Sequence, residues 1–157
     1  MKEGDEPFFF NQLFMETYIV KKEIEISSSA QNVWQALTDP EYTQEYFFGC
    51  AVHSNWNAGD SIVFKRMILW IFPFELKGKI IRINRASLLQ YSLKNTKHSS
   101  ESLVTIRLTE KNGSTIVIVT DDVGQGEGAQ GRYSRSVKGW DKVLGGLKRT
   151  VEEEFEP

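Results

Sequence analysis

The sequence has very little of the side chains that bind metals or form cross-links. It holds one cysteine, Cys50, and two histidines, His53 and His98, in 157 residues. A single cysteine excludes an internal disulfide and is typical of a reducing compartment, so we expect a cytoplasmic protein. Cys50 and His53 are three positions apart on an expected strand and point to opposite faces, so they cannot meet as a nucleophile and base within it. We expect no metal site and no cofactor.

The chain also lacks a large excess of charge and a long apolar run. Its formal net charge is −2 and its isoelectric point is about 5.8, which gives no electrostatic footprint for nucleic acid. No apolar stretch approaches the ~20 residues that span a bilayer, so we expect no membrane span. Acidic residues precede the short Phe8–Phe10 cluster, which is unlike a secretory signal peptide.

The first 16 residues lack any clear period, yet they are too apolar for a free tail. Their apolar side chains are Phe8, Phe9, Phe10, Leu13 and Phe14. We expect an N-terminal arm over residues 1–16 that packs on its own domain or on a neighbouring copy. Residues 17–157 have the length of a single domain with a substantial core.

The end of the chain has a strong apolar period. Over residues 132–155, apolar side chains recur 4, 3, 4, 3 and 4 positions apart, which predicts one side of an α-helix. They are Tyr133, Val137, Trp140, Leu144, Leu147 and Val151. Such a helix is on the order of 35 Å long and must lie across a large apolar surface. Gly145 and Gly146 each cost about 1 kcal/mol relative to Ala, which indicates either a close approach of another element or space for a ligand.

Most of the chain before this helix alternates between apolar and polar residues, as antiparallel strands do. We expect strands over residues 18–26, 50–56, 61–72, 74–83, 87–93, 103–110 and 115–123, and a loop over 94–101. Asn112-Gly113 predicts a two-residue hairpin in which facing residue numbers sum to 225. This register turns Val104, Ile106, Leu108, Val117 and Val119 inward and puts Asp121 at the end of that row. An Asp at a strand end can also face solvent, and we favour that interpretation.

Two short helices are expected after the first strand. Residues 28–31 have the S-x-x-Q form of a capping box and precede apolar residues at helical spacing. Asp39-Pro40 closes that helix and starts a second one over residues 41–48, with Asp39 as the N-cap and Pro40 at the first helical position.

A glycine-rich link, residues 124–131, joins the last strand to the long helix. Its G-x-G-x-x-G spacing matches a dinucleotide-binding fingerprint. However, no second parallel strand follows, and the preceding strand ends in two aspartates that would repel a pyrophosphate. We therefore expect a flexible hinge or lid.

The order of these elements resembles the helix-grip fold of the START-like (SRPBCC) superfamily. Local motifs narrow the resemblance to the Hsp90-ATPase-activator-homologue-like (AHSA1-type) family: VWQALTDPE at 33–41, WNAGD at 56–60, GKIIRI at 78–83 with LLQYS at 88–92, and Gly139-Trp140. The resemblance implies an α+β fold in which a six- or seven-stranded antiparallel sheet wraps around the C-terminal helix. It also implies a cavity that relatives use to bind apolar small molecules, and a few as cyclases or hydrolases.

These observations predict binding of a small, largely apolar ligand between the sheet and the helix. The predicted ligand-cavity residues are Trp34, Tyr46, Phe47, Trp56, Phe64, Tyr91, Val119, Asp121, Trp140 and Leu144. No catalytic constellation is visible, and Asp121 is the one candidate acid or base. The main alternative is a protein-interaction module like the Hsp90 activators, although the sequence leaves no room for the separate Hsp90-binding domain of the eukaryotic co-chaperones. A cyclase or hydrolase is the weaker alternative.

Residues 68–74, ILWIFPF, are apolar on both faces of the expected strand. Together with the N-terminal arm they predict a homodimer, unless the arm covers this patch within one chain. The four tryptophans, Trp34, Trp56, Trp70 and Trp140, are expected in the core or in the cavity wall.

Overall fold

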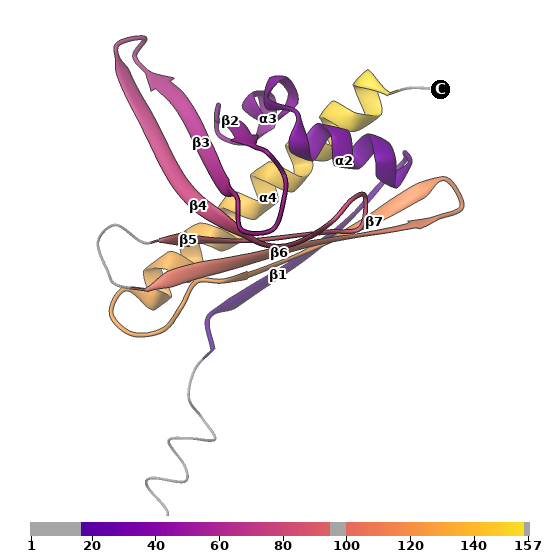
Figure 1. Cartoon of the computed structure of the whole chain (residues 1–157). Helices are drawn as coiled ribbons and strands as arrows, with labels where there is room; N and C mark the ends of the chain where they lie inside the picture. The colour runs from indigo at the N-terminus through magenta and orange to yellow at the C-terminus, as the bar shows by residue number, and fades with distance from the viewer. Residues whose placement is uncertain (1–16, 95–99, 156–157) are drawn as a thin grey trace, which may run out of the picture.

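The computed structural model describes residues 17–94 and 100–155. The predicted N-terminal arm and His98 lie outside the described residues. Within these residues, ten elements follow one another along the chain (Figure 1). They are β1 (Ile19–Ile26), α2 (Ala30–Thr38), α3 (Pro40–Tyr46), β2 (Ala51–Ser54), β3 (Ser61–Ile68), β4 (Phe72–Asn84), β5 (Leu88–Lys94), β6 (Glu101–Lys111), β7 (Ser114–Asp122) and α4 (Ala129–Glu154).

The strands form one seven-stranded antiparallel sheet in the order β1-β7-β6-β5-β4-β3-β2. Figure 1 shows α4 running along one face of this sheet, with α2 and α3 beside its C-terminal half. Trp140, Leu144, Leu147 and Val151 of α4 are buried against the inward strand residues, as the helical period predicted. The arrangement confirms the predicted α+β helix-grip fold with two short helices after the first strand.

The β6–β7 hairpin has the predicted register in full. Lys111 faces Ser114, Val104 faces Asp121, and Ile106 faces Val119. The turn residues Asn112 and Gly113 have φ angles of 54° and 80°, the left-handed conformation that this residue pair favours. All five predicted inward residues of the two strands are buried.

The starts of the two short helices show one correction and one confirmation. The N-cap of α2 is Ser29, whose Oγ accepts a hydrogen bond from the backbone N–H of Asn32 at 3.2 Å, so the capping box predicted from Ser28 is wrong. A shift of one residue is favoured because the Glu110 carboxylate accepts from the N–H of Ala30 at 2.6 Å. Asp39 caps α3 and Pro40 occupies its first turn, as predicted.

The predicted strand over residues 61–72 is wrong, because the chain reverses inside it. β3 ends at Ile68, residues 69–71 form the turn, and Pro73 lies within β4 opposite Met67. The expected break at Pro73 is therefore also wrong. Proline is tolerated there because β4 pairs with β5 only from Gly78 onward, which leaves β3 as the single described neighbour of position 73. Figure 1 shows the resulting β3–β4 ribbon projecting from the sheet.

Candidate functional site

A pocket of about 300 Å³ lies between the sheet and α4, and four predicted cavity residues line it. These are Phe47, Tyr91, Asp121 and Trp140. The other lining residues are Phe48, Leu93, Ser102, Val104, Arg135, Ser136, Gly139 and Val143. They come from β5, β6, β7, α4 and the segment after α3. We call this space the Asp121 pocket.

Asp121 is the polar centre of this pocket. Its side chain is only 7% exposed, so the solvent-facing interpretation is wrong and the hairpin register gives the correct orientation. Its Oδ2 accepts hydrogen bonds from Ser136 Oγ at 2.5 Å and from the Trp140 indole N–H at 3.0 Å. Its Oδ1 is buried and has no hydrogen-bond partner among the described residues. One carboxylate oxygen is therefore held by α4 and the other is unpaired.

Burial raises the pKa of both titratable groups on the sheet side of the pocket, Asp121 and Tyr91. Desolvation raises the pKa of Asp121, while the Ser136 and Trp140 hydrogen bonds oppose that rise. Desolvation also raises the pKa of the Tyr91 phenol well above its ordinary value, and the nearby Asp121 charge raises it further. Tyr91 therefore stays neutral beside the carboxylate.

Phe47 lines both the Asp121 pocket and a second space of about 310 Å³. Its ring lies 5.8 Å from the Trp140 ring and 5.3 Å from the Phe64 ring, measured between centroids. Phe47, Phe48 and Leu93 line both spaces. The second space continues to Ile68 and Phe74 of the β3–β4 ribbon. The two spaces thus share three apolar side chains, and the second is lined mostly by apolar residues, with Arg66 as its one charged residue.

The remaining predicted cavity residues lie elsewhere. Trp34 and Trp56 line a separate hollow of about 370 Å³ beside α2, with Gln31, Gln35 and Arg85. Tyr46, Val119 and Leu144 are buried and line none of these spaces. The Tyr46 hydroxyl donates to the backbone oxygen of Ala36 at 2.8 Å, so its polar end is already satisfied.

Comparisons with known proteins identify the family and the fold. The sequence profile of the family described as "Activator of Hsp90 ATPase homolog 1-like protein" matches residues 27–152. The chain belongs to this family. No curated protein matches the chain significantly.

Solved structures show the same fold for this Hsp90-activator-like chain. ChR145 from Cytophaga hutchinsonii is 31% identical, with a TM-score of 0.68 over 88% of this chain and 97% of that one. MLL2253 from Mesorhizobium loti is 18% identical, with a TM-score of 0.73 over 87% and 98%. The Aha1 dimer from Colwellia psychrerythraea is 14% identical, with a TM-score of 0.68 over 85% and 96%.

The glycine-rich link of this family member is held by Arg132, a residue that no sequence motif marked as functional. Arg132 is buried and donates to the backbone oxygens of Val123, Gln125 and Glu127 at 2.9, 3.3 and 2.7 Å. These bonds tie the link to the first turn of α4, and its flexibility stays a prediction. A cation near the start of a helix is unfavourable because it opposes the helix dipole. The unusual position of Arg132 was therefore the one feature of the sequence that could have indicated its role. α4 also begins at Ala129, three residues before the predicted start.

The two glycines of α4 have different surroundings. A Cβ on Gly146 would lie 2.6 Å from the Cβ of Tyr46, so Gly146 allows α3 to approach α4 closely. A Cβ on Gly145 would meet nothing within 4 Å. The close-approach interpretation therefore explains Gly146 and leaves Gly145 without a packing role.

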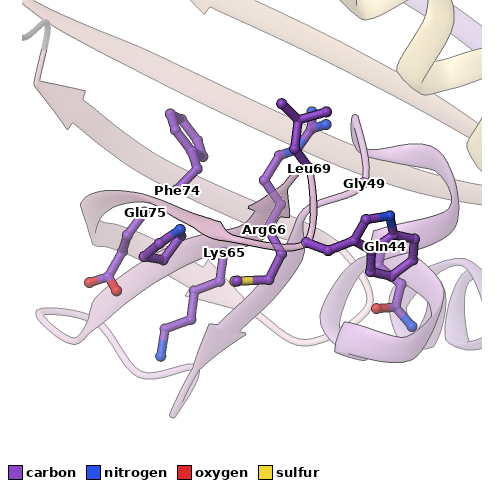
Figure 2. Close-up of a pocket in the computed structure, with 10 residues that line it drawn as sticks. Gln44, Gly49, Lys65, Arg66, Leu69, Phe74 and Glu75 are labelled. Atoms are coloured by element: carbon purple, nitrogen blue, oxygen red, sulfur yellow. The ribbon is translucent and has the colours of Figure 1, made fainter.

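A hollow of about 850 Å³, larger than the Asp121 pocket, lies outside the helix–sheet interface, between the β3–β4 ribbon and the end of α3 (Figure 2). It is lined by Gln44 and Gly49 on one side and by the ribbon on the other.

Within residues 17–94 and 100–155, no helix is long and apolar enough to cross a bilayer. The same residues contain no group of three or more His, Cys, Asp or Glu that could hold a metal ion.

Proposed function

We propose that the Asp121 pocket binds a small, largely apolar molecule and that Asp121 Oδ1 accepts a hydrogen bond from it. The unpaired Oδ1 in a mostly apolar wall, which also includes Arg135 and two serines, carries this proposal. A buried acceptor without a partner costs about 1–3 kcal/mol, which a ligand with one donor group would recover. A volume of about 300 Å³ suits a ligand of one or two fused rings.

The hydrogen bonds from α4 support a binding role for the carboxylate. Because Ser136 and Trp140 both donate to Oδ2, they fix the carboxylate orientation and leave Oδ1 for a ligand. Aromatic rings at Phe47, Tyr91 and Trp140 would contact the apolar body. The lone Cys50 favours a cytoplasmic location for this binding protein.

A matched pair of probes tests the proposal: 2-naphthol, which has one donor, and 2-methoxynaphthalene, which has none. We expect wild-type protein to bind 2-naphthol about tenfold more tightly, the value of one charge-assisted hydrogen bond. NMR titration of the Trp140 indole N–H and tryptophan fluorescence would report both affinities.

The Asp121→Asn variant should lose most of this preference, because a neutral amide oxygen is a weaker acceptor. Glu45→Gln removes the same charge from an exposed site on α3 and should leave both affinities unchanged. Equal affinities of wild-type protein for the two probes, or no saturable binding of either, would contradict the proposal.

The second candidate is a protein-interaction module related to Hsp90 activators. The exposed apolar ribbon favours it, because such patches mark contact surfaces. It predicts that this chain alone stimulates the ATPase of a purified Hsp90, with no dependence on Asp121.

A further inference from the structure

We propose that the tip of the β3–β4 hairpin, residues 67–74, inserts into the headgroup region of an anionic lipid surface. The inference stands whether or not the Asp121 pocket holds a ligand. It rests on the exposure of the tip, its turn geometry, its two apolar faces and the charges behind it.

The tip is a continuous apolar protrusion. Its eight residues, MILWIFPF, contain no charged or hydrogen-bonding side chain except the indole N–H of Trp70, and all eight are exposed. Trp70 is 93% exposed, Leu69 74% and Ile71 71%. Folded proteins rarely keep so much contiguous apolar surface in water without a binding role.

The turn keeps large apolar side chains at the outermost point despite a backbone cost. Leu69 and Trp70 have φ angles of 53° and 64°, in the left-handed region that bulky residues avoid. In the two-residue turn of the β6–β7 hairpin, the left-handed positions are instead occupied by Asn112 and Gly113. Strained residues of this kind suggest a function for the side chains they present.

The tip is apolar on both faces, which favours insertion into lipid over binding to a flat protein surface. β2 pairs with β3 only as far as Lys65, and β5 pairs with β4 only from Gly78, so the tip has no further described strand neighbour. Facing pairs share a side of a ribbon. Ile68 and Phe72 therefore lie on one face, and Met67 and Pro73 on the other. A flat protein surface would cover one face, whereas lipid covers both.

The dimensions of the tip suit the membrane interface. Three strand residues extend about 10 Å, the depth to which interfacial segments enter the headgroup and acyl boundary. Tryptophan is enriched at that boundary.

Positive charge lies directly behind the apolar tip. Lys65 and Arg66 are exposed, and Lys77 forms an ion pair at 3.6 Å with Glu75, the single acidic residue of this stretch. Arg66 is held there because its guanidinium donates to the backbone oxygen of Phe48 at 2.8 Å. Figure 2 shows Lys65 and Glu75 on one side of the ribbon and Phe74 on the other. The chain as a whole has a net charge of −2, so this local excess of cations specifically complements anionic headgroups.

Vesicle flotation with the full chain tests the proposal. The vesicles contain phosphatidylcholine alone or phosphatidylcholine mixed with phosphatidylglycerol, and we expect stronger binding to the mixture. The decisive variant is Leu69→Asn with Trp70→Gly, because Asn-Gly favours the same turn and leaves the hairpin intact. It should weaken binding on the order of a hundredfold.

Two further variants separate the contributions. Lys65→Gln should weaken binding to the mixed vesicles about fivefold and leave binding to phosphatidylcholine unchanged. Leu103→Ser removes a partly exposed apolar side chain on β6 and should change neither.

Absence of wild-type flotation with both vesicles would overturn the proposal, as would full binding by the Asn-Gly variant. The predicted homodimer is the alternative occupant of the same tip. Light scattering over a hundredfold concentration range would test for this dimer. The tip would be a dimer contact if wild-type protein dimerises, the Asn-Gly variant stays monomeric and neither protein binds lipid.

Discussion

At the scale of single residues, Asp121 is the group whose environment matters most. Its pKa is raised in the folded protein, mainly because burial disfavours the charged form. A raised folded-state pKa means that Asp121 supports the fold fully below its unfolded pKa of about 4. That contribution is lost as the pH rises through the folded-state pKa. The ionised carboxylate therefore opposes folding at neutral pH.

We predict that Asp121→Asn raises the free energy of unfolding at neutral pH and that this gain disappears below about pH 4. Urea unfolding at several pH values measures the effect. Glu45→Gln, at an exposed carboxylate, is the control and should show no such trend. A variant that is less stable than wild type at neutral pH would show that ionised Asp121 stabilises the fold through its two hydrogen bonds.

At the scale of elements, the packing of α3 on α4 depends on the absence of a side chain at Gly146. A Cβ at this position would lie 2.6 Å from Tyr46 Cβ and 3.4 Å from its Cα, so a methyl group forces the two helices apart. Overpacking of this kind costs about 1–3 kcal/mol and outweighs the gain in helix propensity, which is about 1 kcal/mol at most.

We predict that Gly146→Ala lowers the free energy of unfolding by about 1 kcal/mol. The neighbouring Gly145→Ala is the matched control, because its Cβ meets open space. It should raise stability by up to about 1 kcal/mol through helix propensity alone. Opposite signs for adjacent glycines would be measured by denaturant unfolding, and equal effects would show that the α3–α4 contact adapts without cost.

At the scale of the whole molecule, the apolar side of α4 is shared by the sheet and by both short helices. Leu144 is buried in the middle of that seam. We predict that Leu144→Ala lowers the free energy of unfolding by ~2–5 kcal/mol, as other large-to-small core substitutions do. Lys138→Ala, on the exposed side of α4, should change it by less than about 0.5 kcal/mol. Comparable losses for the two variants would place the core elsewhere.

Elements that are determined by interactions between residues close in sequence could be predicted from the sequence. The period of α4, the alternation of the strands and the Asn112-Gly113 turn each follow from backbone geometry and neighbouring side chains. The predicted register correctly placed Asp121 on the inward face. The solvent-facing interpretation was wrong because it assumed that a residue at a strand end is exposed. The hairpin at Leu69-Trp70 was missed because these residues have no preference for its turn.

Which inward side chains line the same pocket could be seen only in the tertiary structure. A period tells which face of an element is buried, but it does not tell which other element covers that face. Trp34 and Trp56 therefore share a hollow apart from Trp140, and Trp70 projects into solvent, contrary to its expected core position. Arg132 donates hydrogen bonds to three backbone oxygens of the loop between β7 and α4. That loop takes its shape only when α4 packs on the sheet, so the sequence pattern could not predict these bonds.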